Sequence, residues 1–334
     1  MFDWSDEHKQ IRTALRQFIK KEVEPHNDAM ERGEPPYAPM RKLAGMLGLS
    51  SMVDATLQSL EEAAARGDGE ALSKSGGFAS GRDPYLAAIL AIELSRCNPG
   101  FTMAFGASVG LCGQTLMRRG TLEQKRRWAA PVLRLDKIGA WAITEPGSGS
   151  DAFAMRTTAK KIAPDRYVLN GSKTFITNAP YADVMVVYAK LDIAGEAAGT
   201  RPPQAFVLER GQQGVSTGKP FEKMGMHSSP TGEIFMADVE VGPEHLLGGK
   251  EAEPAHGQVV DVFKGERTGV GHMCFGIIER VLEDALAYAK ERTTWGQPIA
   301  SYQLVQEKLA RMMIAYTNVK SIVETTTSSS STKR

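Results

Sequence analysis

The residues with the clearest capacity for chemistry lie in one short segment, residues 142–151, which reads Ala-Ile-Thr-Glu-Pro-Gly-Ser-Gly-Ser-Asp. Its start is typical of a strand, and its Pro and Gly residues predict a turn. Successive backbone N–H groups in such a turn can form an anion-binding concavity, and the hydroxyls of Thr144, Ser148 and Ser150 add donors. The segment therefore predicts either recognition of a cofactor's phosphate or polar ring, or only a well-formed β-turn.

A competing pattern overlaps this turn, because residues 147–152 fit the relaxed G-x-G-x-x-G/A form of a dinucleotide-binding loop. That fold requires a helix directly after the loop and an acidic residue about 20 positions further on. Residues 153–161 show no helical period, and no strand ends in an acid at that distance. We therefore do not expect a Rossmann domain.

The other residue types that carry out nucleophilic or metal chemistry are scattered. Cys97, Cys112 and Cys274 lack metal-ligand or CxxC spacing, so we expect small buried hydrophobes in a reducing compartment. The histidines have no metal-ligand spacing, and no Ser/His/Asp arrangement stands out. We predict neither a metal site nor a catalytic triad.

Composition narrows the class of protein. The chain of 334 residues suggests about two domains of roughly 150 residues each. Forty basic and 39 acidic residues leave a net charge of +1, which argues against nucleic-acid or anionic-membrane binding. The acidic N-terminus has no apolar signal region. Residues 97–117 are uncharged and long enough to span a bilayer, but Asn98, Pro99 and several glycines favour a buried helix.

The first part of the chain is predicted to be helical. Ser5 is a plausible N-cap for a helix with an apolar face, and Asp83-Pro84 opens a second helix. Thr121 and Gln124 form a capping box for a third helix. Between the first two, residues 61–81 are rich in Ala, Gly and Ser, and we expect a helix end followed by a loop.

The middle of the chain changes to short runs of β-branched and aromatic residues, separated by turn signals such as Asn170-Gly171 and Pro202-Pro203. These runs predict a small antiparallel β domain. The expected strands are residues 140–144, 166–169, 174–177, 184–189, 204–208 and 233–239.

The helical period then returns, with long helices expected over residues 260–292 and 302–324. Residues 325–334 are a Thr/Ser run ending in Lys-Arg, for which we expect disorder. Helices, then strands, then helices indicate an α+β fold rather than βαβ alternation.

Four ordered motifs resemble the acyl-CoA dehydrogenase family of flavoproteins, with a match from about residue 3 to residue 323. The first signature is residues 142–154, and the second is Asn170-Gly-Ser-Lys-Thr-Phe-Ile-Thr-Asn178. The end of the family's β domain and its late helical signature are represented by residues 223–226, 235–241, 246–248 and 292–299, with Gln303.

This resemblance implies an acyl-CoA dehydrogenase-like α+β fold in successive domains. It places an N-terminal all-α domain at residues 1–136, a middle antiparallel β domain at 137–247 and a C-terminal helical domain at 248–324. We expect the C-terminal bundle to be incomplete, followed by the disordered tail at 325–334.

The resemblance also implies FAD as cofactor. Trp141, Ile143 and Thr144 are then expected to line the isoalloxazine ring, with Ser150 where FAD and the CoA ester approach each other. Phe175 and Thr177 are expected to flank the flavin. The family more often has Trp where this chain has Phe175, so the aromatic face is kept and an indole N–H is lost. Arg292, Thr294, Trp295 and Gln303 are expected to contact the FAD of a neighbouring subunit, which implies a dimer or tetramer.

The implied reaction is α,β-dehydrogenation of an acyl-CoA thioester to the trans-2-enoyl-CoA. A carboxylate removes the α proton while the β hydrogen leaves as hydride, and an electron-transferring flavoprotein accepts the electrons. Such a base needs a pKa raised toward working pH by desolvation, and the thioester oxygen needs hydrogen bonds where charge develops.

The family supplies this base from either of two positions, and the commoner one lies beyond the last residue of this sequence. The other matches Glu266, next to Arg267. We therefore predict that Glu266 is the base and that Arg267 helps to hold the substrate. Glu145 is interpreted as structural. His227 stands where the family often has Arg, which puts the family's polar contact there in doubt.

Other hypotheses remain open. One is a flavin-binding relative with other chemistry, such as nitroalkane oxidation or a DNA-associated role, although the near-neutral charge weakens the latter. Another is a non-catalytic, truncated chain. We expect a cytoplasmic protein, or one in the mitochondrial matrix of a eukaryote. The sequence does not predict the acyl chain length or branching. We expect residues 97–117 to line the floor of the acyl pocket.

Overall fold

A computed structural model describes residues 4–68, 83–195, 202–251 and 256–332, without the side chains of residues 84, 256–266 and 330–332. The chain divides into two compact units. The first combines Met1–Asn27, Arg82–Thr102 and Asp261–Arg334, and the second combines Asp28–Gly81 and Met103–Val260. Each unit is described by itself.

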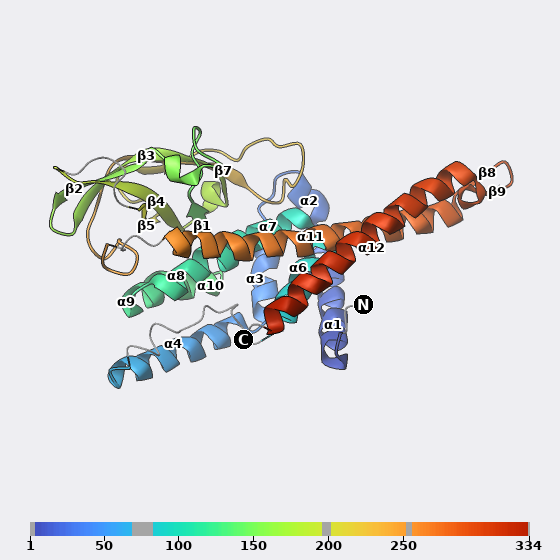
Figure 1. Cartoon of the computed structure of the whole chain (residues 1–334), viewed down its shortest axis with the longest axis horizontal. Helices are drawn as coiled ribbons and strands as arrows, with labels where there is room; N and C mark the ends of the chain where they lie inside the picture. Colours follow the sequence, from blue (N-terminus) through green and yellow to red (C-terminus); the bar gives the residue numbers. More distant parts are fainter. Residues whose placement is uncertain (1–3, 69–82, 196–201, 252–255, 333–334) are drawn as a thin grey trace. The chain divides into compact units, whose positions relative to one another are not determined.

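The first unit is built from long helices, and their starts follow the predicted caps. Ser5 accepts a hydrogen bond from the backbone of His8, and Asp83 accepts one from the backbone of Tyr85. The helices are α1 (Asp6–Glu22), η1 (Glu24–His26), α6 (Pro84–Cys97), α11 (His256–Glu291) and α12 (Gln303–Thr332). In Figure 1, the β8–β9 hairpin (Thr293–Thr294 and Gln297–Pro298) joins the end of α11 to the start of α12. A cluster around Ile92, Phe275 and Val323 packs α6, α11 and α12 together.

A buried carboxylate also ties these helices together. Glu93 on α6 is 1% exposed and accepts hydrogen bonds from Arg12 Nε at 2.7 Å and Arg16 Nε at 2.6 Å, both on α1. Arg96, one turn further along α6, donates to Glu279 on α11 at 2.6 Å. The apolar faces thus set the packing, and this charge cluster links α1, α6 and α11.

The end of α12 differs from expectation. We predicted disorder from residue 325 onward, but the helix continues to Thr332. The hydroxyls of Thr325 and Thr326 donate to carbonyls four residues earlier, which satisfies them within the helix. Thr327 is 2% exposed, and its hydroxyl lies 2.8 Å from Nε2 of the buried His272 on α11. Tertiary packing thus overrides the low-complexity pattern.

The second unit contains shorter helices and all the strands of the large sheet. Its helical elements are α2 (Asn27–Glu31), α3 (Tyr37–Met46), α4 (Leu49–Ala65), η2 (Gly106–Gly113), α8 (Gln114–Arg119), α9 (Leu122–Gln124), η3 (Lys125–Ala129) and α10 (Ala130–Leu133). The predicted capping box of Thr121 and Gln124 is present at α9. Helix α7 (Pro99–Phe105) precedes η2, so residues 97–117 are mainly helical, as expected.

The sheet has seven strands in the order β1-β4-β2-β3-β7-β6, with β5 on the other edge of β4. Its strands are β1 (Gly139–Ala142), β2 (Thr158–Ala163), β3 (Arg166–Thr177), β4 (Val184–Asp192), β5 (Gln204–Glu209), β6 (Val215–Thr217) and β7 (Thr231–Val241). Most pairs are antiparallel, as predicted, but β4 pairs in parallel with both β1 and β2. The α+β fold class is confirmed, and the sheet is mixed rather than wholly antiparallel.

The turn predicted at Asn170-Gly171 is wrong. Strand β3 runs through both residues, so the two expected strands are one. The register with β7 shifts between Leu169 and Gly171, and Gly171 has a φ of +144°. A Cβ there would lie 2.6 Å from the Thr157 hydroxyl oxygen, so the glycine permits a bulge and a close strand contact.

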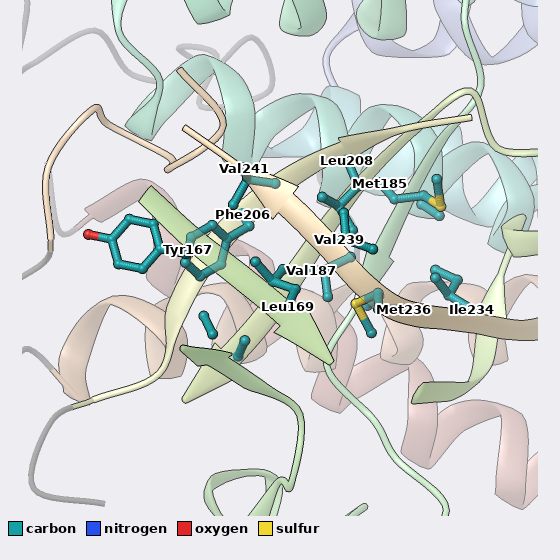
Figure 2. Packing of buried hydrophobic residues seen from close by; sticks show 14 of the residues in the cluster. Tyr167, Leu169, Met185, Val187, Phe206, Leu208, Ile234, Met236, Val239 and Val241 are labelled. Atoms are coloured by element: carbon teal, nitrogen blue, oxygen red, sulfur yellow. The ribbon is translucent and has the colours of Figure 1, made fainter. Parts of the chain in front are cut away.

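The core of this unit forms where the sheet curls over itself. Figure 2 shows that Tyr167 and Leu169 of β3 and Val239 of β7 point toward side chains of β4 and β5, including Phe206. The rings of Tyr167 and Phe206 meet edge-to-face with centroids 5.4 Å apart. Alternate burial along β3 and β7 follows the period of two expected for strands with one covered face.

We predict that Glu93→Gln lowers the free energy of unfolding by about 3 kcal/mol, because the partly buried Arg12 and Arg96 lose the buried carboxylate charge that faces them. The matched control is Glu240→Gln, since Glu240 forms an exposed pair with Arg166. Exposed pairs contribute about 1 kcal/mol or less. Chemical denaturation of both variants measures the difference, and equal losses would contradict the role given to Glu93.

Candidate functional site

Strand β1 and the segment that follows it carry the first group of predicted site residues. Trp141 and Ile143 are buried, at 8% and 5% exposure, and Trp141 packs edge-to-face on Tyr188 with centroids 5.2 Å apart. Thr144 is half-buried and Ser150 is exposed. The side chains accessible to a ligand are therefore those of Thr144 and Ser150, and any contact from Trp141 or Ile143 is limited by their burial.

The glycine-rich turn is closed by its own backbone. The N–H of Glu145 donates to the carbonyl of Ser148 at 2.9 Å, and the reverse bond is 3.1 Å long. The Ser148 hydroxyl donates to the carbonyl of Asp151 at 2.6 Å, so its proton is used within the turn. Nothing lies within 4 Å of where a Cβ would stand on Gly147 or Gly149. The segment is thus a well-formed turn whose backbone is open on its outer side.

The segment after this turn excludes the dinucleotide-binding alternative. A short 3-10 turn, η4 (Ala152–Ala154), is followed directly by β2. No α-helix starts at the turn, so its backbone N–H groups are not presented by a helix N-terminus as that fold requires. The sequence argued against a Rossmann domain, and the structure confirms this prediction.

Strand β3 carries the second group of predicted residues at an irregularity. Its register with β7 shifts within residues 173–176. Phe175 has a φ of +56° and is 70% exposed, so the ring is turned out of the sheet. The N–H of Thr174 donates to the carbonyl of Thr144 at 3.0 Å. Thr177 is half-buried two residues further on. This hydrogen bond brings the two predicted flavin-contacting segments side by side.

A buried ion pair joins the same two segments. Lys173 is fully buried, and its Nζ donates to Glu145 Oε1 at 2.8 Å and to the carbonyl of Ile143 at 3.2 Å. The Glu145 carboxylate also accepts the backbone N–H groups of Arg156 at 2.5 Å and Thr157 at 2.9 Å. The ammonium and the carboxylate therefore fix both residues that flank Thr144.

The position of Glu145 explains why this pair is needed. Strands β1 and β2 follow one another along the same edge of β4, where Ala142 pairs with Val187 and Thr158 pairs with Lys190. The turn leaves the sheet between them. The carboxylate of Glu145 occupies this interruption and satisfies N–H groups that would otherwise lack a strand partner.

Burial and pairing act on the pKa values of both groups. Burial lowers the pKa of Lys173, and the Glu145 carboxylate opposes this shift. Burial alone would raise the pKa of Glu145, but hydrogen bonds from Lys173 and from the Arg156 and Thr157 backbone outweigh it, and the pKa lies below its ordinary value. A pKa below its ordinary value keeps the Glu145 carboxylate ionised at neutral pH, and the interpretation of Glu145 as structural agrees with these contacts.

Asn178, the last residue of the second motif, holds the end of β3. It is fully buried at a φ of +68°. Its side-chain amide donates to the carbonyls of Ala104 at 2.9 Å and Gly139 at 3.2 Å, and accepts from the Tyr37 hydroxyl at 3.1 Å. The sequence analysis included Asn178 in the second motif but assigned it no role. Its signal was an amide residue directly after an apolar strand, where a left-handed φ is tolerated.

The remaining predicted residues belong to the first unit. Glu266 lies on α11, and its side chain is outside the described part of the chain. Arg267, beside it on the helix, is exposed. The prediction that Glu266 is a base therefore rests on its place in the sequence and on the helix.

The β8–β9 hairpin gathers the other four residues at one end of α11 and α12. Arg292 and Gln303 are exposed, and Trp295 is 94% exposed at a φ of +50°. Thr294 is half-buried, and its carbonyl accepts the Tyr302 hydroxyl at 2.8 Å. The predicted set is thus brought together here, with a large aromatic surface open to a partner.

The cysteines and His227 give mixed outcomes. Cys112 is buried, and burial raises its pKa to about 12, so it is an inert hydrophobe as expected. Cys97 is half-buried and Cys274 is exposed, which corrects that expectation for both. His227 lies between the Lys223 carbonyl, which Nε2 approaches closely, and Glu31, whose carboxylate is 3.3 Å from Nδ1.

Within residues 4–68, 83–195, 202–251 and 256–332, no group of three or more His, Cys, Asp or Glu side chains is placed to hold a metal ion. Over the same ranges, no helix is both long enough and apolar enough to cross a bilayer.

Comparison with known proteins identifies the family. Residues 71–136, 140–239 and 257–334 match the models of the acyl-CoA dehydrogenase N-terminal, middle and C-terminal domains. The chain is 34% identical over 312 residues to the 3-(aryl)acrylate reductase of Clostridium sporogenes (strain ATCC 15579), covering 92% of this chain and 75% of that protein.

Solved structures agree. Butyryl-CoA dehydrogenase from Megasphaera elsdenii superposes with a TM-score of 0.81 at 28% identity, over 100% of this chain and 82% of that one. An acyl-CoA dehydrogenase complexed with FAD from Bacillus anthracis gives a TM-score of 0.77 at 34% identity, over 98% of this chain and 51% of that one. The chain belongs to the acyl-CoA dehydrogenase family of flavoprotein oxidoreductases, as its four motifs predicted.

We predict that Lys173→Met lowers the free energy of unfolding by about 3–5 kcal/mol, because it leaves the Glu145 carboxylate buried without its cation. The Arg156 and Thr157 amides should also exchange faster with solvent, since their acceptor loses its anchor. Denaturant titration and hydrogen exchange measure the two effects.

The control is Lys161→Met, because Lys161 pairs with Glu251 at 2.7 Å but both side chains are partly exposed. We expect a loss of about 1 kcal/mol. If Lys173→Met is no more destabilising than Lys161→Met, the buried pair does not anchor the turn.

Proposed function

We propose that this protein catalyses FAD-dependent α,β-dehydrogenation of an acyl-CoA thioester to the trans-2-enoyl-CoA. The observation that carries the proposal is the hydrogen bond from Thr174 N–H to the Thr144 carbonyl, which joins the segment of Thr144 to the residue before Phe175, whose ring is 70% exposed. Membership of the acyl-CoA dehydrogenase family supports it.

The residues present suit a flavin. A planar, polar-edged ring system needs an apolar face to pack on and hydrogen-bonding groups at its rim. Phe175 offers a ring that is 70% exposed, and Thr144 and Ser150 offer accessible hydroxyls beside an open turn backbone. FAD supplies the hydride-accepting chemistry when it is bound, and the protein orients the reacting groups.

We assign the proton chemistry to Glu266. Its carboxylate removes the α proton of the thioester, while the β hydrogen leaves as hydride. Arg267, the next residue on α11, is exposed and assists in holding the anionic substrate. The family match over residues 257–334 supports both assignments, because it covers the helix on which they lie. Ser150, exposed at the end of the turn, contacts the substrate as well as the flavin.

We further propose a homodimer or homotetramer in which the hairpin residues Arg292, Thr294, Trp295 and Gln303 bind the FAD of a neighbouring subunit. The 94% exposure of Trp295 supports this role, because a large ring left in solvent is typical of a contact surface. The guanidinium of Arg292 suits a pyrophosphate, since its planar fork donates in pairs.

A second candidate is the opposite direction of the same reaction, reduction of a 2-enoyl thioester or related acrylate. The 34% identity to a 3-(aryl)acrylate reductase favours it. Microscopic reversibility gives Glu266 the reverse task, delivery of a proton to the α carbon. For both directions we propose an electron-transferring flavoprotein as the redox partner. A cytoplasmic location stays a prediction.

We predict that the purified protein is yellow and that an acyl-CoA bleaches its flavin absorbance under anaerobic conditions. Glu266→Gln should keep FAD but slow bleaching by about 10²- to 10⁴-fold, because the general base is lost. The control is Glu307→Gln, which alters an exposed carboxylate on α12 that pairs with Arg311. It should bleach at the wild-type rate. Stopped-flow absorbance at graded acyl lengths measures the rates.

The outcomes separate the parts of the proposal. A colourless protein that FAD cannot reconstitute contradicts the flavin site. Bleaching that survives Glu266→Gln contradicts the base assignment alone. Reoxidation of reduced flavin by enoyl-CoA, without bleaching by any acyl-CoA, favours the reductase.

A further inference from the structure

The ring of Phe175 is held in an unusual way. A φ of +56° is rare for an aromatic residue, and such conformations persist only where the surroundings enforce them. The register shift between Lys173 and Ile176 removes this stretch from the regular ladder with β7. A strained backbone that points a large apolar ring into solvent serves no purpose in core packing, so it indicates a contact surface.

A second ring stands next to it. Phe221 meets Phe175 with ring centroids 5.5 Å apart and an interplanar angle of 68°. This is the edge-to-face arrangement that aromatic pairs prefer, with the positive edge of one ring against the negative face of the other. Phe221 itself is half-buried, whereas Phe175 is 70% exposed. The pair therefore has one anchored ring and one presented ring.

The backbone fixes the anchored ring. The N–H of Phe221 donates to the Thr231 carbonyl at 2.8 Å, and the N–H of Gly218 donates to the Glu233 carbonyl at 3.0 Å. Thr231 is in turn the β7 partner of Thr177, two residues beyond Phe175. The segment carrying Phe221 thus extends the edge of the sheet beside β7, within reach of the irregular end of β3.

We propose that Phe221 is a positioning residue that holds the Phe175 ring in the orientation in which it packs against the isoalloxazine of FAD. The inference rests on the proposed function. An exposed phenyl ring without a neighbour rotates freely and loses that freedom on binding, whereas a ring already held in place loses less. An indole carries an N–H that needs a polar partner, but a phenyl ring does not, so an apolar ring is a suitable support for Phe175.

The test uses the full-length protein stripped of FAD and titrated with FAD, with flavin fluorescence and visible circular dichroism as readouts. Phe221→Leu should weaken FAD binding by about three- to tenfold, the range expected for loss of one edge-to-face pair. It should also change the circular dichroism of bound flavin, which reports the asymmetry of its surroundings. Phe221→Tyr keeps the ring and should restore both readouts to within about twofold of wild type.

The matched control is Phe235→Leu, because Phe235 on β7 is a partly exposed phenylalanine outside the pair, at 40% exposure. It should leave FAD affinity and the flavin signal unchanged. In a Phe175→Leu background, Phe221→Leu should have no further effect, since Phe221 acts only through Phe175. Should Phe221→Leu lower the melting temperature, Phe221→Met, an unbranched apolar side chain that adapts to irregular gaps, is titrated in its place.

The proposal is overturned if Phe221→Leu matches Phe235→Leu in affinity and flavin signal, or if its effect persists undiminished without the Phe175 ring. Failure of this inference is distinguishable from failure of the proposed function. A wild-type protein that binds no FAD overturns both, whereas tight wild-type binding that is insensitive to Phe221 overturns only the positioning role.

Discussion

The buried pair of Lys173 and Glu145 is the constraint on which the candidate site depends. A charged carboxylate and ammonium cannot be left in an interior without partners, because each loses its hydration there. Several contacts that satisfy them also fix parts of the site: the Ile143 carbonyl before Thr144, Glu145 after it, and the backbone of Arg156 and Thr157 directly before β2. These contacts anchor the turn that interrupts the sheet.

Strand β3 serves two purposes in consecutive residues. Lys173 points inward to the pair, Thr174 donates to Thr144, and Phe175 turns outward at a left-handed φ. In a regular strand Lys173 and Phe175, two residues apart, would lie on the same face. The left-handed φ of Phe175 and the register shift at this point turn its ring outward while Lys173 stays buried. In our proposal, the exposed ring gives the sheet a defined place for a flat cofactor.

Local signals predicted much of the fold. The caps at Ser5, Asp83 and Thr121 are present, because capping depends on neighbouring residues alone. The α+β class was predicted from the change between helical and strand-like sequence patterns along the chain. The predictions failed where residues far away in the sequence determine the structure. Asn170-Gly171 lies inside β3, where Thr157, the residue before β2, packs closely on Gly171. The Thr/Ser run stays helical because Thr327 packs beside His272. The parallel pairing of β4 with β1 and β2 likewise depends on topology that periodicity does not encode.

For the candidate site, too, the sequence predicted some residues and missed others. Motif resemblance singled out Thr144, Ser150 and Phe175, of which Ser150 and Phe175 are exposed and Thr144 is half-buried. The hydrogen bond from Thr174 links the segment of Thr144 to β3. It did not predict the roles of Lys173, Asn178 and Phe221, whose partners are far away in the sequence. The most direct test of the account is a crystal structure of the protein loaded with FAD. The account predicts the isoalloxazine against the Phe175 ring and hydrogen-bonded to Thr144. A flavin bound elsewhere, with both of these side chains in solvent, would contradict it.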